Sequence, residues 1–202
     1  MSDRLINAAK DGVIKVVREE LSSDIDIHFD SNAALCWASN NGHIKIIDLL
    51  IEHGACVNRG NALSTPIGFA ARNGHKNAVQ LLLDHGADVQ ANNNNALVLA
   101  SEFGHVDTVK LLSEYGADIH AQNDRSLIMA SKNGHIETTR YILDHGDHFS
   151  EQIYYSVHYA SKNGHLEIVN LLLERGAFSW LHILKKGVLK WKLQQTIKTY
   201  IY

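Results

Sequence analysis

A unit of about 30 residues recurs along this chain, and the repeat limits the possible folds more than any other feature of the sequence. Residues 130–146 read ASKNGHIETTRYILDHG, and residues 160–176 read ASKNGHLEIVNLLLERG. Six full or partial copies cover residues 5–178, and a period of this length is typical of a solenoid built from stacked units. The copies are centred on Gly12, Gly42, Gly74, Gly104, Gly134 and Gly164, at separations of 30, 32, 30, 30 and 30 residues.

Each unit predicts two short helices. In the second copy Leu35, Ala38 and Ser39 follow one another at steps of three and one residues, so they share one helix face. The second helix of that copy has its own apolar positions at helical spacing. Two short helices cannot bury their apolar faces alone, whereas stacked neighbours can, so we expect an all-α solenoid. The equivalents of the first-helix positions are Leu97, Ala100 and Ser101, and the apolar positions of the second helix are Ile44, Ile47, Leu50 and Ile51.

Glycine and asparagine mark the expected helix ends. A glycine follows each second helix, where a left-handed residue ends a helix without a steric penalty on Cβ. Asparagine ends four of the first helices, and it also tolerates the left-handed conformation. Phe103 interrupts this asparagine series. The glycines are Gly54, Gly86, Gly116, Gly146 and Gly176, and the asparagines are Asn41, Asn73, Asn133 and Asn163.

The third copy, STPIGFAARNGHKNAVQLLLDHGADV, resembles the ankyrin repeat. Thr65 and Pro66 start its first helix, with proline at a position where its missing N–H is harmless. Ankyrin units have about 33 residues, whereas most units here have 30, so the projecting fingers between repeats are expected to be short. The shortened unit resembles the repeats abundant in giant DNA viruses. The resemblance implies an ankyrin-type array over residues 1–178 that binds a partner protein on its concave wall.

The recurring Gly-His pair favours a structural role over a metal site. Five of the 13 histidines lie one per repeat, about 8–10 Å apart in stacked helices, which is too far to share one metal ion. We expect each imidazole to bond to backbone at the turn between helices. A metal in the DHGDH segment, residues 144–148, is the minor alternative, since a helix end explains those residues. Without a nucleophile or phosphate-binding motif, we expect no cofactor and no enzyme activity.

A helical wheel of the first helix predicts the binding surface. Trp37 and Asn40 point away from the core side that Leu35 defines, and aromatic, Met and Arg side chains are enriched at interface cores. Phe103, an aromatic residue at a polar capping position, is the strongest single candidate. The alternative is that the apolar members only pack against the next repeat. The predicted partner-binding residues are Trp37, Asn40, Phe69, Arg72, Leu99, Glu102, Phe103, Met129, Lys132, Tyr159 and Lys162.

Charge is distributed unevenly along the chain. Six of the 19 basic residues and none of the 22 acidic residues lie from Arg175 onward, which leaves 13 basic against 22 acidic residues, a net charge of −9, for residues 1–174. Residues 179–202 are expected to form a basic helical cap over the last repeat. The alternative function is attachment of this segment to an anionic membrane or to nucleic acid.

The remaining features predict a monomeric protein in the cytoplasm, or in the host cytoplasm if its origin is viral. Cys36 and Cys56 lack the spacing of a zinc site or disulfide framework, and both are interpreted as reduced packing residues. The N-terminal MSDRLINAAKDG enters an amphipathic pattern directly, which argues against a signal peptide.

Overall fold

The computed structural model describes residues 2–23, 26–60, 65–146 and 151–177, and these residues form α-helices without strands. Each repeat contributes two of them, which we call its first and second helix. A short π-helix, Leu173–Ala177, follows the last α-helix. The α-helices are α1 (Ser2–Asp11), α2 (Ile14–Leu21), α3 (Phe29–Asn40), α4 (Ile44–Glu52), α5 (Pro66–Arg72), α6 (Lys76–Asp84), α7 (Ala91–Glu102), α8 (Val106–Glu114), α9 (Ala121–Lys132), α10 (Ile136–His145), α11 (Glu151–Lys162) and α12 (Leu166–Leu172).

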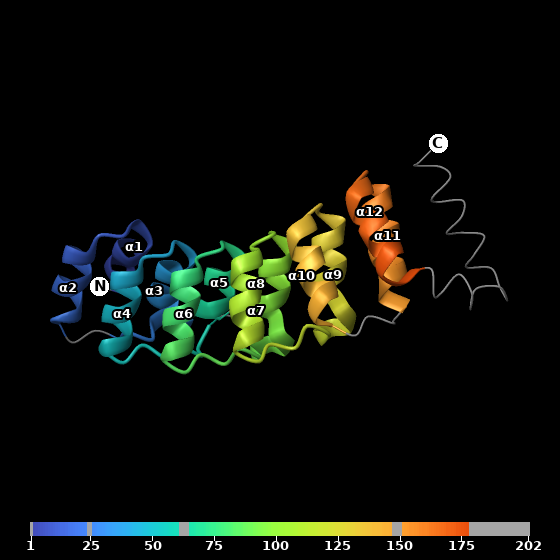
Figure 1. Ribbon diagram of the computed structural model, residues 1–202. Helices are drawn as coiled ribbons and strands as arrows, with labels where there is room; N and C mark the ends of the chain where they lie inside the picture. Colours follow the sequence, from blue (N-terminus) through green and yellow to red (C-terminus); the bar gives the residue numbers. More distant parts are fainter. Residues whose placement is uncertain (1, 24–25, 61–64, 147–150, 178–202) are drawn as a thin grey trace. The chain divides into compact units, whose positions relative to one another are not determined.

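The chain divides into two compact units. Unit 1 comprises Met1–Ala100 and Asp107–Asp118, and unit 2 comprises Ser101–Val106 and Ile119–Tyr202. In unit 1 the first helices α1, α3 and α5 pack side by side in chain order, and the second helices α2, α4 and α6 do the same (Figure 1). In unit 2, α9 packs on α11 and α10 on α12. This stacking of neighbours within each unit is the arrangement of an α-solenoid, as the repeat predicts.

The core consists of the positions that the helical periodicity indicates. Leu35, Ala38 and Ser39 are at most 1% exposed, and so are their equivalents in α7. Each fully buried Leu or Ile contributes roughly 1.5–3 kcal/mol of hydrophobic stabilisation. On α4 four apolar residues are predicted to face the core. Ile47 and Leu50 are buried, whereas Ile44 and Ile51 are only half-buried.

The turn between the two helices of a repeat explains the Asn-Gly-His sequence. Gly42 has φ 68°, and its N–H and that of His43 bond to the carbonyls of Ser39 and Ala38, the pattern of a Schellman cap. The prediction that these asparagines adopt the left-handed conformation is wrong, because Asn41 has φ −103° and Asn73 has φ −98°. The left-handed residue is the glycine after each asparagine.

The asparagine and the histidine instead connect one repeat to the repeat before it. Asn41 Nδ2 donates to the carbonyl of Lys10 at 2.7 Å, and His43 Nε2 lies 3.0 Å from the same oxygen. Asn163 and His165 make the equivalent contacts with the carbonyl of Lys132 at 2.7 and 3.1 Å. The predicted bond from histidine to backbone is therefore confirmed, and it recurs at His75 and His135, which contact the carbonyls of Asn40 and Glu102.

The histidine ring also explains why the turn requires glycine in front of it. An added Cβ on Gly42 would lie 2.7 Å from Nδ1 of His75, and one on Gly134 would lie 2.6 Å from Cε1 of His165. Contacts this short require the ring to move. The histidine of one repeat therefore packs where a side chain on the glycine of the preceding repeat would lie.

The ends of the second helices follow the prediction in three repeats. Gly54, Gly86 and Gly116 have φ values of 95°, 80° and 90° and complete Schellman caps. Gly146 does not, because its backbone is extended at φ −126° and ψ 147°. Gly176 lies inside the π-helix rather than at a left-handed end.

Three-residue left-handed turns lie at the start of two first helices, a feature that the repeat pattern does not indicate. Asn92–Asn94 and Gln122–Asp124 all have φ between 52° and 61°. Asn and Asp tolerate this conformation better than other residues with a side chain. Buried Asn94 then accepts a hydrogen bond from the Asp118 N–H at 2.9 Å, which ties the turn to the next connecting segment.

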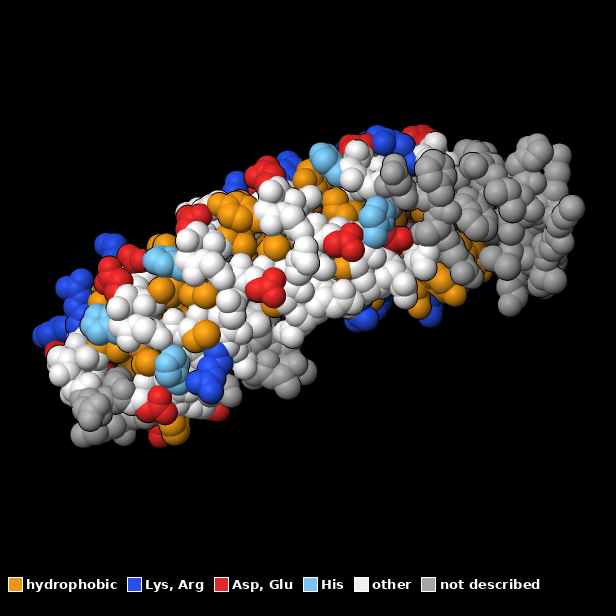
Figure 2. Space-filling view, turned by 90° about the horizontal axis from the view of Figure 1, so that it is seen from below, with side chains coloured by type: hydrophobic (Ala, Val, Ile, Leu, Met, Phe, Trp, Pro, Cys, Tyr) orange, Lys and Arg blue, Asp and Glu red, His pale blue; other side chains and the backbone are white. Residues whose placement is uncertain are grey.

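The connecting segments between the repeats of unit 1 lie on the side shown in Figure 2. Backbone and polar side chains cover most of this side, and hydrophobic side chains form small separate patches among acidic residues and histidines. Cys56 lies in one of these segments and is exposed, so its interpretation as a packing residue is wrong. Among the described residues, no helix has the length and apolar character needed to span a membrane. The predicted cap, residues 179–202, lies outside the described residues.

Candidate protein-binding face

The predicted binding residues all lie on first helices or directly after them. We call this surface the first-helix face. None of them is buried in the core, and Trp37 and Phe103 are 39% and 43% exposed. Contact with a partner stays a prediction for all of them. Unit 1 contains Trp37, Asn40, Phe69, Arg72 and Leu99, and unit 2 contains Glu102, Phe103, Met129, Lys132, Tyr159 and Lys162.

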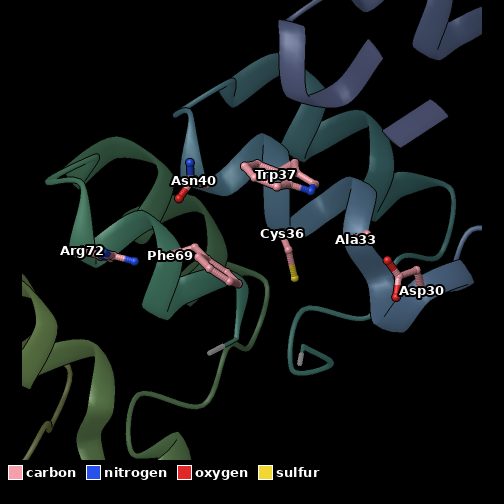
Figure 3. A pocket seen from close by; sticks show the side chains of 7 residues that line it. All are labelled: Asp30, Ala33, Cys36, Trp37, Asn40, Phe69 and Arg72. Carbon is pink, nitrogen blue, oxygen red and sulfur yellow. The ribbon is translucent and has the colours of Figure 1, made fainter. Parts of the chain in front are cut away.

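In unit 1 four of these side chains surround one pocket between α3 and α5. The pocket has a volume of about 270 Å³. Trp37 and Phe69 form its aromatic walls, and the sulfur of Cys36 points into the space between Phe69 and Asp30 (Figure 3). Asp30 and Arg72 lie at opposite ends in this view. The lining residues are Asp30, Ala33, Cys36, Trp37, Asn40, Phe69 and Arg72.

The pocket exists because small residues separate the large ones. Ala33, Trp37 and Asn40 are four and three residues apart on α3, so they share one helix face. Buried Ala33 and Cys36 are too small to fill the space that Trp37 and Phe69 enclose. On the shorter α5, Phe69 and Arg72 are three residues apart and line the other side.

The Cys36 thiol at the floor of the pocket has a raised pKa. Burial, and to a smaller extent the negative charge of Asp30, together raise the pKa of the Cys36 thiol to about 12. The thiol is therefore protonated at neutral pH and is a poor nucleophile. At the other face of the wall, Lys10 Nζ lies 4.6 Å from the centre of the Trp37 ring, a cation–π contact that helps to hold the indole in place.

Sequence reasoning missed three members of the pocket, namely Asp30, Ala33 and Cys36. The spacing of Ala33 from Trp37 was an available signal, because residues four apart on a helix are neighbours. Asp30 was not accessible in this way, since its φ of 48° breaks the helix at that point and makes a helical wheel misleading. Asp30 lines the pocket only because the backbone turns at this residue.

In unit 2 the equivalent positions have different chemistry. Measured from the glycine of each repeat, Ala33, Cys36, Trp37 and Asn40 correspond to residues nine, six, five and two positions before it. On α9 these places hold Arg125, Ile128, Met129 and Lys132, and on α11 they hold Tyr155, His158, Tyr159 and Lys162. The rings of α11 contact one another, with Tyr154 and Tyr155 centroids 5.7 Å apart and those of His158 and Tyr159 5.4 Å apart.

The described part of the DHGDH segment is occupied by structural contacts. Asp144 forms an ion pair with Arg175 at 2.5 Å. His145 Nδ1 lies 2.8 Å from the carbonyl of Tyr141, and its ring stacks on that tyrosine. Within the described ranges, no group of three or more His, Cys, Asp or Glu side chains could hold a metal ion. Asp147 and His148 lie outside those ranges.

Comparison with known families agrees with this architecture. The family of ankyrin repeats matches residues 58–123 and 120–181 as blocks of three copies, and the single ankyrin repeat matches residues 30–62. Together these matches cover about three-quarters of the chain, so the protein belongs to the ankyrin repeat family. Ankyrin repeats are in general protein–protein interaction modules without catalytic activity. No curated protein matches the chain significantly in sequence.

Proposed function

We propose that this protein binds a partner protein through its first-helix face and acts as an adaptor, a scaffold or a competitor. The pocket between α3 and α5 is the observation that carries the proposal. It combines an exposed and a half-buried aromatic wall, Trp37 and Phe69, with an apolar floor and charged ends, which is the composition of an interface anchor site.

The pocket is suited to one apolar side chain of the partner. Burying a Leu or Phe side chain contributes roughly 1.5–3 kcal/mol, enough to make it the dominant contact of an interface. Asp30 at one end and Arg72 at the other give the site a polarity, so a partner segment would bind in one direction. The protonated Cys36 thiol contributes apolar surface to this site and no reactivity.

The test is affinity capture from cell lysate with mass spectrometry. The tagged wild-type chain is compared with a Trp37→Ala, Phe69→Ala, Phe103→Ala variant whose helicity has been checked by circular dichroism. We expect a protein captured by the wild type to be lost from the variant, because the aromatic anchors are removed.

The matched control carries three substitutions on second helices, Lys45→Ala, Asn77→Ala and Asn170→Ala. All three residues are exposed and away from the first-helix face. The control should retain the captured protein. Equal capture by both variants and the wild type, or no capture by any of them, would contradict the proposal.

A further inference from the structure

Three exposed cations lie on the first helices of unit 2: Lys132 and Lys162 belong to the first-helix face, and Arg125 lies beside it on α9. Arg125 and Lys132 are seven residues apart on α9, which places them two turns, about 10 Å, apart on one face. Lys162 occupies the position of Lys132 on α11, and α11 packs directly on α9. Neighbouring packed helices are about 8–10 Å apart. The backbone position of Lys132 therefore lies about 10 Å from those of Arg125 and Lys162, and the latter two, across the diagonal, are about 14 Å apart.

The acids of unit 2 do not neutralise these cations. Among the described residues, no acidic side chain forms an ion pair with Arg125, Lys132 or Lys162. Asp124 is bonded to His120 instead, at 2.6 Å. Glu102 is the acidic member of the first-helix face in unit 2. Its negative charge and the three positive charges sum to +2.

Apolar and aromatic groups lie between the charges. Met129 is four residues after Arg125 and three before Lys132, on the same side of α9, and it is half-buried. On α11, Tyr155 is 42% exposed and Tyr159 is half-buried. Tyrosine offers both an apolar ring and a hydroxyl that can donate to a carboxylate.

We infer that this surface of unit 2 binds an acidic segment of the partner protein. The inference rests on the proposed function and specifies the chemistry of the partner. In a polyproline II segment three residues make one turn of about 9 Å, so Asp or Glu residues at positions i and i+3 lie on one side and match the separation of Lys132 and Lys162. An apolar residue between them would contact Met129 and Tyr159.

Charge favours an acidic peptide over a nucleic acid or a membrane. Unit 2 has 10 basic and 8 acidic residues, a net charge of only +2, which is a weak field for attracting a long polyanion. Polyanion binding depends on many phosphate contacts along a broad basic surface. A short acidic segment needs only the local cluster of three cations.

The experiment selects peptides from a phage-displayed library of random segments of about 12 residues on the full-length chain. Affinities of the selected peptides are then measured for the wild type and for a Lys132→Glu, Lys162→Glu variant checked by circular dichroism. We expect Asp or Glu enriched at a spacing of three, and a loss of affinity of about tenfold or more in the variant, because two attractive pairs become repulsive. A Lys45→Glu, Lys76→Glu variant carries the same charge change on second helices and should bind normally.

Other outcomes would overturn the inference and separate it from the proposed function. Selected peptides without acidic enrichment, lost on Trp37→Ala but not on charge reversal, would contradict the inference and leave the proposed function intact. Failure to select any peptide would contradict both. Tighter binding of an oligouridylate of about 12 nucleotides, or of phosphatidylserine vesicles, would show that the cations serve nucleic acid or lipid.

Discussion

The first-helix faces of the two units are built from equivalent helices and differ in the side chains that those helices carry. In unit 1 the positions nine and six residues before the repeat glycine hold Ala33 and Cys36, and a pocket lies over them. In α9 of unit 2 the same positions hold Arg125 and Ile128, which have larger side chains. We expect side-chain size at these two positions to decide whether a pocket forms.

The contacts between repeats are the same in both units. Asparagine and histidine bond to one carbonyl of the preceding repeat, at Lys10 in unit 1 and at Lys132 in unit 2. These two acceptors are backbone carbonyls, so the bonds do not require particular side chains at Lys10 and Lys132. Asn73 is an exception, because its Nδ2 donates to Oδ1 of Asn40 on the first-helix face at 2.9 Å. The repeat can therefore vary its binding chemistry while keeping the bonds that stack it.

The largest expected effect tests whether the two units share this scaffold. We expect Gly42→Ala in unit 1 and Gly134→Ala in unit 2 to lower the free energy of unfolding by similar amounts, about 2–4 kcal/mol. Each combines a left-handed penalty of about 1–2 kcal/mol with displacement of a histidine ring and loss of its hydrogen bond. Gly86→Ala is the control, since its φ is 80° but nothing lies within 4 Å of its added Cβ, so it should cost about 1–2 kcal/mol. Urea denaturation measures all three, and equal costs for Gly42→Ala and Gly86→Ala would show that the histidine contact is unimportant.

The second prediction concerns filling the pocket of unit 1 with the larger residues that unit 2 has at the equivalent positions. The double substitution Ala33→Arg, Cys36→Ile introduces the residues that α9 has at these places. We expect affinity for peptides whose binding requires Trp37 to fall about tenfold or more, or about 1.4 kcal/mol, because the anchor side chain loses its site. Fluorescence anisotropy with such peptides measures the loss. Unchanged affinity would mean that the pocket does not receive the anchor.

The repeat architecture could be predicted from sequence because packing imposes a period on the residues. Burial of Leu35, Ala38 and Ser39 follows from helical spacing alone, and so does the outward position of Trp37. The role of Asn41 could not be read in the same way, since asparagine suits both a left-handed residue and a side-chain donor. Only the position of the Lys10 carbonyl in the neighbouring repeat decides between them.

The pocket was only half predictable for a related reason. A helical wheel identifies large residues that point away from the core, such as Trp37 and Phe69, whereas a cavity also depends on small residues beside them. Ala33 and Cys36 line the pocket because their side chains are too small to fill it. Asp30 belongs to it because its backbone leaves the helix, and a wheel assumes that it does not.

The third prediction concerns the thiol that unit 1 has where α9 has Ile128. Because the folded pKa of Cys36 is about 12, above the 9.0 of a free thiol, the folded state keeps a proton that the unfolded state releases. The stabilising effect is fully present below pH 9 and is lost as the pH rises toward 12. We expect the stability of the wild type to fall more steeply over this range than that of Cys36→Ala, as measured by urea denaturation at several pH values. Parallel pH profiles would contradict it.

The same thiol gives a simple chemical check at lower pH. At pH 8 a disulfide reagent such as dithionitrobenzoate should modify exposed Cys56 in the folded chain and reach Cys36 only after denaturation. Cys56→Ala isolates the second reaction. Rapid modification of Cys36 in the folded Cys56→Ala variant would show that the pocket floor is open and its thiol more acidic than the structure indicates.

The smallest expected effect concerns the cation that supports the pocket wall. Lys10 stands over Trp37 in unit 1, whereas the matching pair of positions in unit 2 holds Glu102 and Met129, which cannot form a cation–π contact. Because Trp37 is partly exposed, we expect the contact to stabilise the fold by only about 0.5 kcal/mol. Lys10→Met alone would also remove a charge from the C-terminal end of α1, so a double-mutant cycle with Trp37→Leu is needed to cancel that change. A coupling energy of about 0.5 kcal/mol from urea denaturation would show that Lys10 holds the indole in place. A coupling energy near zero would mean that Trp37 keeps its position through packing alone, so that the wall of the pocket depends on α3 and α5 and not on the repeat before them.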